Sequence, residues 1–377
     1  MSFIEQDAFQ KACAGGDLGV VRELLALTGA RAIDVHADDE RAFRKACRNG
    51  HLDVVRELLA LTGDRAVDVH AAPESAFLLA CEHGRAGVVR ELLALTGHRR
   101  INVHAQRAIA LRWACHNGHT AVMRELLSLT DSRAVDRSVV TEVFHEACWR
   151  GWLGVVRAFL ATTGAYRIDR KTLYTAYDYA VWIGETSVVE ELLAVNDDRR
   201  IPAHTITNLH GYHVLDVVCG RGYLDTLRTL LALTGDRRLD VHQHYEQAFC
   251  SACTHGRLAV VRELLALDGD RRVDTHAMRD HGFRAACAGR YTDVMQELLA
   301  LPLDRAPTFA AQRKCASRCE SAAAAWTTDA PTWRRCRVRM SALRPALRAQ
   351  VRDGARRALW TVRAHAVYSR LRRPSKT

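Results

Sequence analysis

The chain has 377 residues, of which 48% are hydrophobic and 26% are charged, and its formal net charge is +11. This hydrophobic fraction is enough for a continuous core, which argues against a natively disordered chain. The apolar runs are far shorter than the roughly 20 residues that a membrane-spanning helix needs, so we expect no transmembrane segment.

One ten-residue sequence motif recurs along the chain. Residues 54–63 read Val-Val-Arg-Glu-Leu-Leu-Ala-Leu-Thr-Gly and return almost unchanged at residues 20–29, 88–97 and 260–269. Weaker copies begin at five further positions, namely Val122, Val155, Val188, Thr226 and Val294. The resulting period of 33 to 38 residues is typical of stacked supersecondary units, which expose a long surface suited to binding.

Each repeat predicts two short helices joined by a turn. Ala42, Phe43, Ala46 and Cys47 are spaced as one apolar face of a first helix, which Asn-Gly-His then ends. The apolar positions of residues 52–61 predict a second helix that ends before a glycine. Neither helix is long enough to be stable alone, so each repeat must pack against its neighbours.

This pattern resembles the ankyrin repeat. Residues 49–59 contain the Gly-His turn followed by Val-Val-x-x-Leu-Leu, and residues 68–71 read Asp-Val-His-Ala, which is similar to the Asp-Val-Asn-Ala loop of that family. The family's Thr-Pro-Leu-His opening is absent, since residues 41–44 are Arg-Ala-Phe-Arg. The resemblance implies an all-α, ankyrin-type helix-pair solenoid of about nine repeats that binds proteins.

We expect residues 1–301 to form the solenoid, 302–332 a linker, and 333–377 an Arg-rich amphipathic helix or a disordered tail. Residues 330–377 contain 14 Lys and Arg side chains and one acid, Asp353, so this basic tail carries a net charge of +13. The tail could be disordered or the product of a reading-frame shift, cap the last repeat, or bind a polyanion. The candidate polyanion-binding residues are Arg334, Arg335, Arg337 and Arg339.

The chain contains twelve cysteines, and eight of them occupy one position of the repeat. These are Cys13, Cys47, Cys81, Cys115, Cys148, Cys219, Cys253 and Cys287. We expect this cysteine column to consist of buried free thiols, because residues one repeat apart are not expected to pair systematically. Such cysteine use, together with a start that lacks the pattern of a signal peptide, predicts an intracellular protein of the cytoplasm or nucleus.

Two groups of residues could suggest a metal or redox site, but we expect both to have structural roles. A histidine column in the loops is expected to make hydrogen bonds rather than hold a metal, because no four ligands converge. Its members are His36, His70, His104, His204, His242 and His276. The Cys-x-x-Cys of Cys250 and Cys253 includes a column cysteine, so we expect it to be structural. Nucleotide-binding, metalloprotease and nucleophile-elbow motifs are absent, which predicts a non-enzymatic protein without cofactor or metal.

The residues after each column cysteine vary between repeats, and the resemblance implies that they face a concave groove and contact partners. The predicted partner-binding residues are Arg48, Asn49, Glu82, His83, Trp113, His116, Asn117, Trp149, Arg150 and Trp182. Tryptophan and arginine dominate many interfaces, although Trp152 and nearby tyrosines could instead fill the core. We expect a monomeric protein–protein interaction scaffold; the alternative is nucleic-acid or acidic-surface association through the tail.

Overall fold

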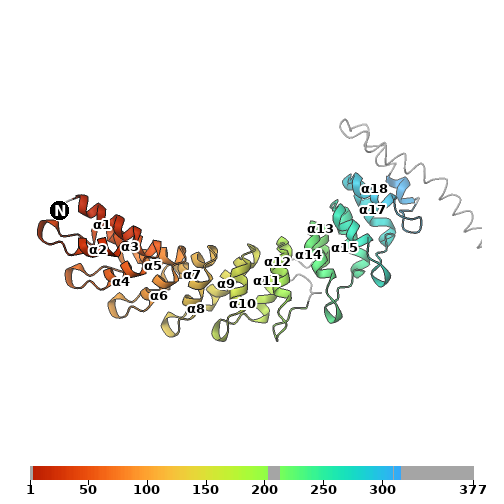
Figure 1. Ribbon diagram of the computed structural model, residues 1–377. Coiled ribbons are helices and arrows are strands. Elements are labelled where there is room, and N and C mark those ends of the chain that lie inside the picture. Colours follow the sequence, from red (N-terminus) through yellow and green to blue (C-terminus); the bar gives the residue numbers. More distant parts are fainter. Residues whose placement is uncertain (1–2, 203–212, 309, 316–377) are drawn as a thin grey trace, which may run out of the picture. The chain divides into compact units, whose positions relative to one another are not determined.

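The described part of the chain is all α-helical, as predicted. The computed structural model describes residues 3–202, 213–308 and 310–315. These residues form pairs of α-helices, and short 3-10 helices lie in many of the connecting loops (Figure 1). Two compact units are present, unit 1 (Met1–Ile201) and unit 2 (Pro202–Thr377). None of the helices in the described ranges is long and apolar enough to cross a membrane.

Unit 1 contains two rows of helices. The first helices of the pairs are α1 (Phe3–Gly15), α3 (Ala37–Asn49), α5 (Ala71–Glu82), α7 (Ala105–His116), α9 (Arg137–Trp149) and α11 (Arg170–Ile183). The second helices are α2 (Leu18–Leu25), α4 (Leu52–Leu59), α6 (Ala86–Leu93), α8 (Thr120–Leu127), α10 (Leu153–Leu160) and α12 (Thr186–Leu193). The loops contain η1 (Gly29–Arg31), η2 (Gly63–Arg65), η3 (Gly97–Arg99), η4 (Asp131–Arg133) and η5 (Gly164–Tyr166). Each helix packs on its counterpart in the next pair (Figure 1).

Helix α4 shows how the repeated sequence motif folds. Val54, Val55 and Leu58 are buried, while Arg56 on the opposite side is exposed. The turn before the helix contains Gly50 with φ 88°, a left-handed conformation that glycine adopts without the penalty of a side chain. With only 8 residues, α4 depends on its contacts with α2 and α6 for stability.

The cysteine column and a row of phenylalanines form the core between first helices. Cys47 and Cys81 are fully buried, and Phe43 and Phe77 are each 1% exposed. Burial raises the pKa of the Cys115 thiol to about 12, so this side chain stays protonated and acts as a small apolar group.

Unit 2 repeats this arrangement. Its described helices are α13 (Val214–Arg221), α14 (Leu224–Leu231), η6 (Gly235–Arg237), α15 (Gln243–Thr254), α16 (Leu258–Leu265), η7 (Gly269–Arg271), α17 (Ala277–Gly289) and α18 (Thr292–Leu299). Arg271 donates a hydrogen bond to the carbonyl of Leu231, and Arg305 donates in the same way to Leu265. The contacts between repeats therefore continue past residue 301, into the segment for which the sequence predicted a linker.

Five of the first helices (α3, α9, α11, α15 and α17) begin in one of two ways, neither of which uses the Thr-Pro-Leu-His opening. Residues 38–40, 244–246 and 278–280 have φ between 49° and 63°, so three consecutive residues adopt a left-handed turn. In contrast, α9 and α11 begin with capping aspartates, because Asp136 and Asp169 accept hydrogen bonds from backbone N–H groups of the first turn.

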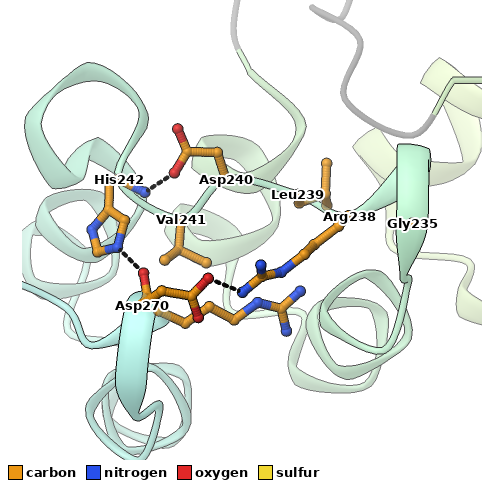
Figure 2. Close-up of a pocket in the computed structure, with 8 residues that line it drawn as sticks. Gly235, Arg238, Leu239, Asp240, Val241, His242 and Asp270 are labelled. Atoms are coloured by element: carbon orange, nitrogen blue, oxygen red, sulfur yellow. Dashed lines mark hydrogen bonds and ion pairs between the residues drawn. The ribbon is translucent and has the colours of Figure 1, made fainter.

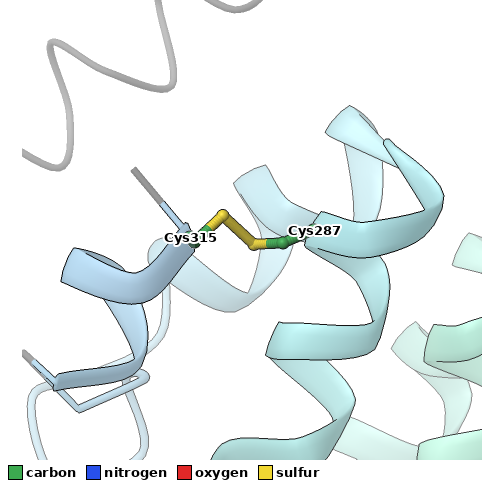
Figure 3. The surroundings of a disulfide bond; sticks show 2 residues. All are labelled: Cys287 and Cys315. Atoms are coloured by element: carbon green, nitrogen blue, oxygen red, sulfur yellow. A yellow bond between two sulfur atoms is a disulfide. The ribbon is translucent and has the colours of Figure 1, made fainter. Parts of the chain in front are cut away.

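The last member of the cysteine column departs from the prediction. Cys287 was expected to be a free thiol and Cys315 to lie in a linker, but the two form a disulfide with a Cα–Cα distance of 5.9 Å (Figure 3). The prediction of buried free thiols is confirmed for the other column members, all of which are buried and unpaired. The prediction is wrong for Cys287 because its partner Cys315 lies outside the repeated sequence motif, where the sequence pattern predicts no disulfide partner.

Candidate partner-binding site

The predicted partner-binding residues of unit 1 lie at or near the carboxyl-terminal ends of the first helices, and we call them the helix-end row. Its members are Arg48, Asn49, Glu82, His83, Trp113, His116, Asn117, Trp149, Arg150 and Trp182. Contacts join neighbouring repeats along the row. The Nε of Arg48 donates to Nε2 of His83 over 3.1 Å, and Nδ1 of His83 donates to the carbonyl of Leu79 over 3.0 Å.

The two asparagines of the row hold neighbouring repeats together. Nδ2 of Asn49 donates to the carbonyl of Ala14 over 2.7 Å. Nδ2 of Asn117 donates to the carbonyl of Glu82 over 3.1 Å. These carbonyls belong to the ends of the preceding first helices, where the helix itself supplies no N–H partner. Asn49 and Asn117 therefore stabilise the contact between neighbouring repeats, a role that the sequence pattern did not predict.

Trp149 and Arg150 form the most prominent exposed feature of the row. The Cζ atom of Arg150 lies 5.0 Å from the ring centre of Trp149 and 5.6 Å from that of Trp152. A guanidinium over an indole is worth about 0.5–1 kcal/mol at exposed sites. Trp149 nevertheless remains 44% exposed. The cation thus orders two large aromatic side chains while leaving one of them accessible.

Carboxylates balance the charge beside these rings. Nε of Arg150 lies 3.1 Å from Oε1 of Glu146, one helical turn earlier in α9. Oε2 of Glu146 lies 3.7 Å from Nη1 of Arg112, which also pairs with Glu142. Two cations and two carboxylates therefore stand together, and the charges cancel.

Trp152 belongs to the surface rather than to the core. It is half-buried, and its ring meets that of His116 edge to face, with 5.1 Å between ring centres. Trp152 occupies the position of the turn histidine in other repeats, where His51 donates to the carbonyl of Ala14. The position of Trp152 within the repeat therefore predicts that its side chain contacts the preceding repeat. The interpretation of the sequence did not include this contact. We call His116, Glu146, Trp149, Arg150 and Trp152 the Trp–Arg cluster.

The remaining tryptophans of the row are partly exposed. Trp113 is in α7 and its carbonyl accepts a hydrogen bond from Nδ2 of Asn117 over 3.0 Å. Trp182 lies in the last turn of α11. Their place on the ends of first helices agrees with the sequence pattern, and their role in binding stays a prediction.

The second helices carry a different surface, a ladder of ion pairs between neighbouring repeats. Arg56 of α4 lies 2.9 Å from Glu91 of α6, and equivalent pairs occur along both units. The equivalent pairs are Arg22–Glu57, Arg90–Glu125, Arg157–Glu191, Arg228–Glu263 and Arg262–Glu297. The pattern is interrupted after Arg124, where Ala158 occupies the position of the glutamate. Because most charges here have a partner, this face offers less for recognition than the helix-end row.

The histidine column makes the hydrogen bonds that were predicted for it. Nε2 of His36 donates to the carbonyl of Asp64 over 2.8 Å, and the other described members donate to the carbonyl 28 residues ahead. These members are His70, His104, His242 and His276. His204 lies outside the described residues. Within the described ranges, no group of three or more His, Cys, Asp or Glu side chains could hold a metal ion.

An open cleft of about 370 Å³ lies between the loops of unit 2. It is lined by Gly235, Arg238, Leu239, Asp240, Val241, His242, Asp270 and Arg271 (Figure 2). Nη2 of Arg238 lies 2.6 Å from Oδ2 of Asp270, and Nε2 of His242 donates to the carbonyl of the same residue over 2.7 Å. These polar groups bind one another across the cleft, so they do not converge on a ligand position.

The Cys-x-x-Cys pair is buried, with Cys250 1% and Cys253 0% exposed. Burial raises the pKa of Cys250 to about 11 and also raises that of Cys253. The thiolate is the reactive and metal-binding form, so this environment opposes both redox and zinc chemistry. The candidate polyanion-binding residues Arg334, Arg335, Arg337 and Arg339 lie outside the described residues.

Comparison with known proteins identifies the repeat. Residues 46–137, which run from α3 to the start of α9, match the family model described as ankyrin repeats (3 copies). No curated protein matches the chain. The family match covers three copies, so the predicted total of about nine repeats stays a prediction.

Proposed function

Because the chain carries ankyrin repeats, we propose that it is a non-enzymatic scaffold that captures a protein partner through the helix-end row and the neighbouring loop tips of a concave face. Ankyrin repeats are generally protein–protein interaction modules, and their all-helical fold is typically non-enzymatic. The identity of the face and of the residues that bind is the part we propose.

Bonds between repeats support this function because they fix the spacing of the exposed side chains. His51 donates to the carbonyl of Ala14 over 2.8 Å, and Arg65 donates to the carbonyl of Leu25 over 3.1 Å. The repeat of α3 and α4 is therefore tied to the preceding one after each of its two helices. Residues held in a fixed register lose little conformational entropy when a partner docks, which favours binding.

The observation that carries the proposal is the Trp–Arg cluster. Trp149 is a large apolar side chain that stays 44% exposed although it lies next to another repeat. Tryptophan and arginine are enriched among the few residues that contribute most of the binding energy of interfaces. Arg150 stacks on the indoles and thereby keeps them in one position before a partner arrives.

The chemistry of the cluster indicates what the partner brings to it. Since Arg112 and Arg150 are balanced by Glu142 and Glu146, net charge does not select the partner here. We expect an apolar or aromatic side chain to pack on Trp149. A carbonyl or carboxylate of the partner would then accept hydrogen bonds from the guanidinium edge of Arg150 that the ring stacking leaves open.

Affinity capture from cell extract with the full chain tests the proposal, followed by titration of each purified captured protein. The triple variant Trp149→Ala/Arg150→Ala/Trp182→Ala should lose capture and keep the helical circular dichroism of the wild type. Arg124→Ala, an exposed residue of the second-helix face, is the matched control and should bind normally. Equal capture by the wild type and the triple variant would contradict the proposal.

We further expect the protein to act as a monomer inside the cell, in the cytoplasm or nucleus. The described free thiols suit a reducing compartment. Deletion of residues 330–377 separates the alternative function, because binding by the basic tail would vanish with the deletion and fall steeply with salt. Capture through the repeats would survive it.

A further inference from the structure

We propose that Cys287 and Cys315 form a reversible disulfide that holds a short cap on the last repeat of unit 2. Cys287 lies in α17 and Cys315 lies in the helical segment 310–315 (Figure 3). Their Cα atoms are 5.9 Å apart, which is within the usual range of about 4.4–6.8 Å for disulfides. The backbone of the cap therefore already places the two sulfur atoms within bonding reach.

The cap occupies the place of another first helix. Cys315 follows Cys287 by 28 residues. In the preceding repeats, the residue 28 positions after a column cysteine lies in the next first helix, as Arg41 does after Cys13 and His281 after Cys253. The segment 310–315 thus begins a further repeat in register with the others and covers the end of the stack, where a solenoid needs a capping element.

Hydrogen bonds, buried side chains and the disulfide hold the residues after α18; in the cap, Ala311 is 3% and Gln312 is 4% exposed. Hydrogen bonds fix the loop: Arg305 donates to the carbonyl of Leu265 over 3.2 Å, and Oγ1 of Thr275 donates to the carbonyl of Arg305 over 2.7 Å. The N–H of Thr308 donates to Oδ2 of Asp280 over 3.3 Å. Farther along, the disulfide joins the helical segment to α17. So short a helix is not stable by itself, and the packing of its few buried side chains is all that holds it once the disulfide opens, so opening should make it detach more often while the loop stays bound.

The position of Cys287 at the end of the column accounts for its redox chemistry. Cys253, one repeat earlier, is fully buried beneath the complete helix α17, and burial raises its pKa. Cys287 lies at the short cap and is 7% exposed in the disulfide, and its partner Cys315 is 2% exposed. Thiol–disulfide exchange requires access and a thiolate, so it takes place at this pair when the short cap opens.

The reaction balances with a small disulfide such as oxidised glutathione as the oxidant. The thiolate of one cysteine attacks the oxidant, forms a mixed disulfide and releases one reduced thiol. The second cysteine then attacks the protein sulfur of that mixed disulfide and releases another. Formation of the new S–S bond removes two thiol protons and two electrons from the protein. The oxidant takes up these protons and electrons and is released as two thiol molecules. Excess reduced glutathione or dithiothreitol runs the sequence backwards and frees the cap.

Full-length protein equilibrated with oxidised or reduced glutathione tests the proposal. Non-reducing peptide mass spectrometry should find the 287–315 cross-link only in the oxidised sample. After reduction, we expect hydrogen exchange of the amides in residues 311–315 to become at least about tenfold faster, because local opening no longer has to break the covalent link. The amides of α13, far along the chain, should exchange as before.

Two variants sharpen this experiment. Cys315→Ser should show the fast exchange of the reduced cap under both conditions. Cys319→Ser, which keeps the proposed pair, is the matched control and should retain both the cross-link and the redox dependence. The proposal is overturned if the oxidised protein lacks the 287–315 cross-link, if Cys319→Ser removes it, or if residues 311–315 exchange equally fast in both redox states.

Discussion

His36 and Glu40 act together as a clamp on the next repeat. Nδ1 of His36 lies 2.5 Å from Oε1 of Glu40, and Nε2 of His36 donates to the carbonyl of Asp64. Oε1 of Glu40 also accepts the N–H of Asp68 over 3.0 Å. One loop of the following repeat is therefore held at both a carbonyl and an amide. The pairs His242–Glu246 and His276–Asp280 repeat this arrangement in unit 2.

The clamp predicts a pH dependence of stability. Hydrogen bonds to the Asp64 carbonyl and to Glu40 raise the pKa of His36, and those to Glu246 and the Asp270 carbonyl raise the pKa of His242. Since the folded pKa values exceed the unfolded value of about 6.5, the stabilisation is complete below that pH and is lost as the pH rises through the folded values. We expect Glu40→Gln/Glu246→Gln to be less stable than the wild type at pH 6, with a smaller difference at pH 9.

Urea unfolding of both proteins across this pH range measures the difference. Glutamine keeps an oxygen that can accept the loop N–H and removes only the charge, so the variant isolates the interaction with the imidazolium. A difference in unfolding free energy that is the same at pH 6 and pH 9 would show that the histidines do not titrate against these carboxylates.

A pair of glycine variants tests the turn and helix assignments. A Cβ on Gly50, whose φ is 88°, would lie 2.6 Å from Cδ of Arg85, so Gly50→Ala should destabilise by more than about 1 kcal/mol. Gly154 lies in α10 with no atom within 4 Å of an added Cβ, so Gly154→Ala should stabilise by about 0.5–1 kcal/mol. Thermal unfolding checks the two signs, and a stabilising Gly50→Ala would refute the left-handed turn.

Apolar packing, rather than the ion-pair ladder, should supply most of the cohesion between repeats. Arg56 is exposed and pairs with a partly exposed glutamate, so Arg56→Ala should cost less than about 1 kcal/mol. Phe43 is 1% exposed, and Phe43→Ala should cost about 3–5 kcal/mol. Chemical denaturation of the two variants gives the comparison. Similar losses for both would mean that the ladder matters far more than its exposure implies.

The column thiols should react only after unfolding. Burial raises the pKa of Cys13 to about 12, and the described free cysteines are all buried. We expect the column thiols to react little with a thiol reagent at pH 8 in the native protein. Without reductant, the denatured protein should show most of the twelve cysteines to be free, apart from the pair Cys287–Cys315. Widespread disulfides would overturn the intracellular assignment.

The parts of the fold that repeat in sequence were predictable. Val54, Val55 and Leu58 recur with helical spacing, and each copy buries the same face, so the second helices followed directly from the pattern. The column cysteines followed for the same reason. Each position of the repeat occurs in several copies. In each copy, the helical preference of the local sequence and the packing against neighbouring repeats favour the same structure.

Features that occur once, or that depend on three-dimensional register, were not predictable. The sequence placed Asn49 among the partner-binding residues, but its amide is used on the Ala14 carbonyl. Trp152 was open to interpretation as a core residue until its contact with His116 showed its orientation. The left-handed turn at residues 38–40 was not predicted, because a single aspartate is compatible with positive φ but three consecutive residues without a glycine are not expected to adopt it.

The most direct test of the binding face uses a photo-crosslinking amino acid in the full chain. It is placed at position 183, an exposed site next to Trp182 of the helix-end row, or at position 124, on the exposed second-helix face. Each protein is mixed with the partner identified by affinity capture, irradiated, and analysed for covalent adducts. The proposed function predicts an adduct at position 183 and little at position 124. Strong cross-linking at position 124 with none at position 183 would contradict it.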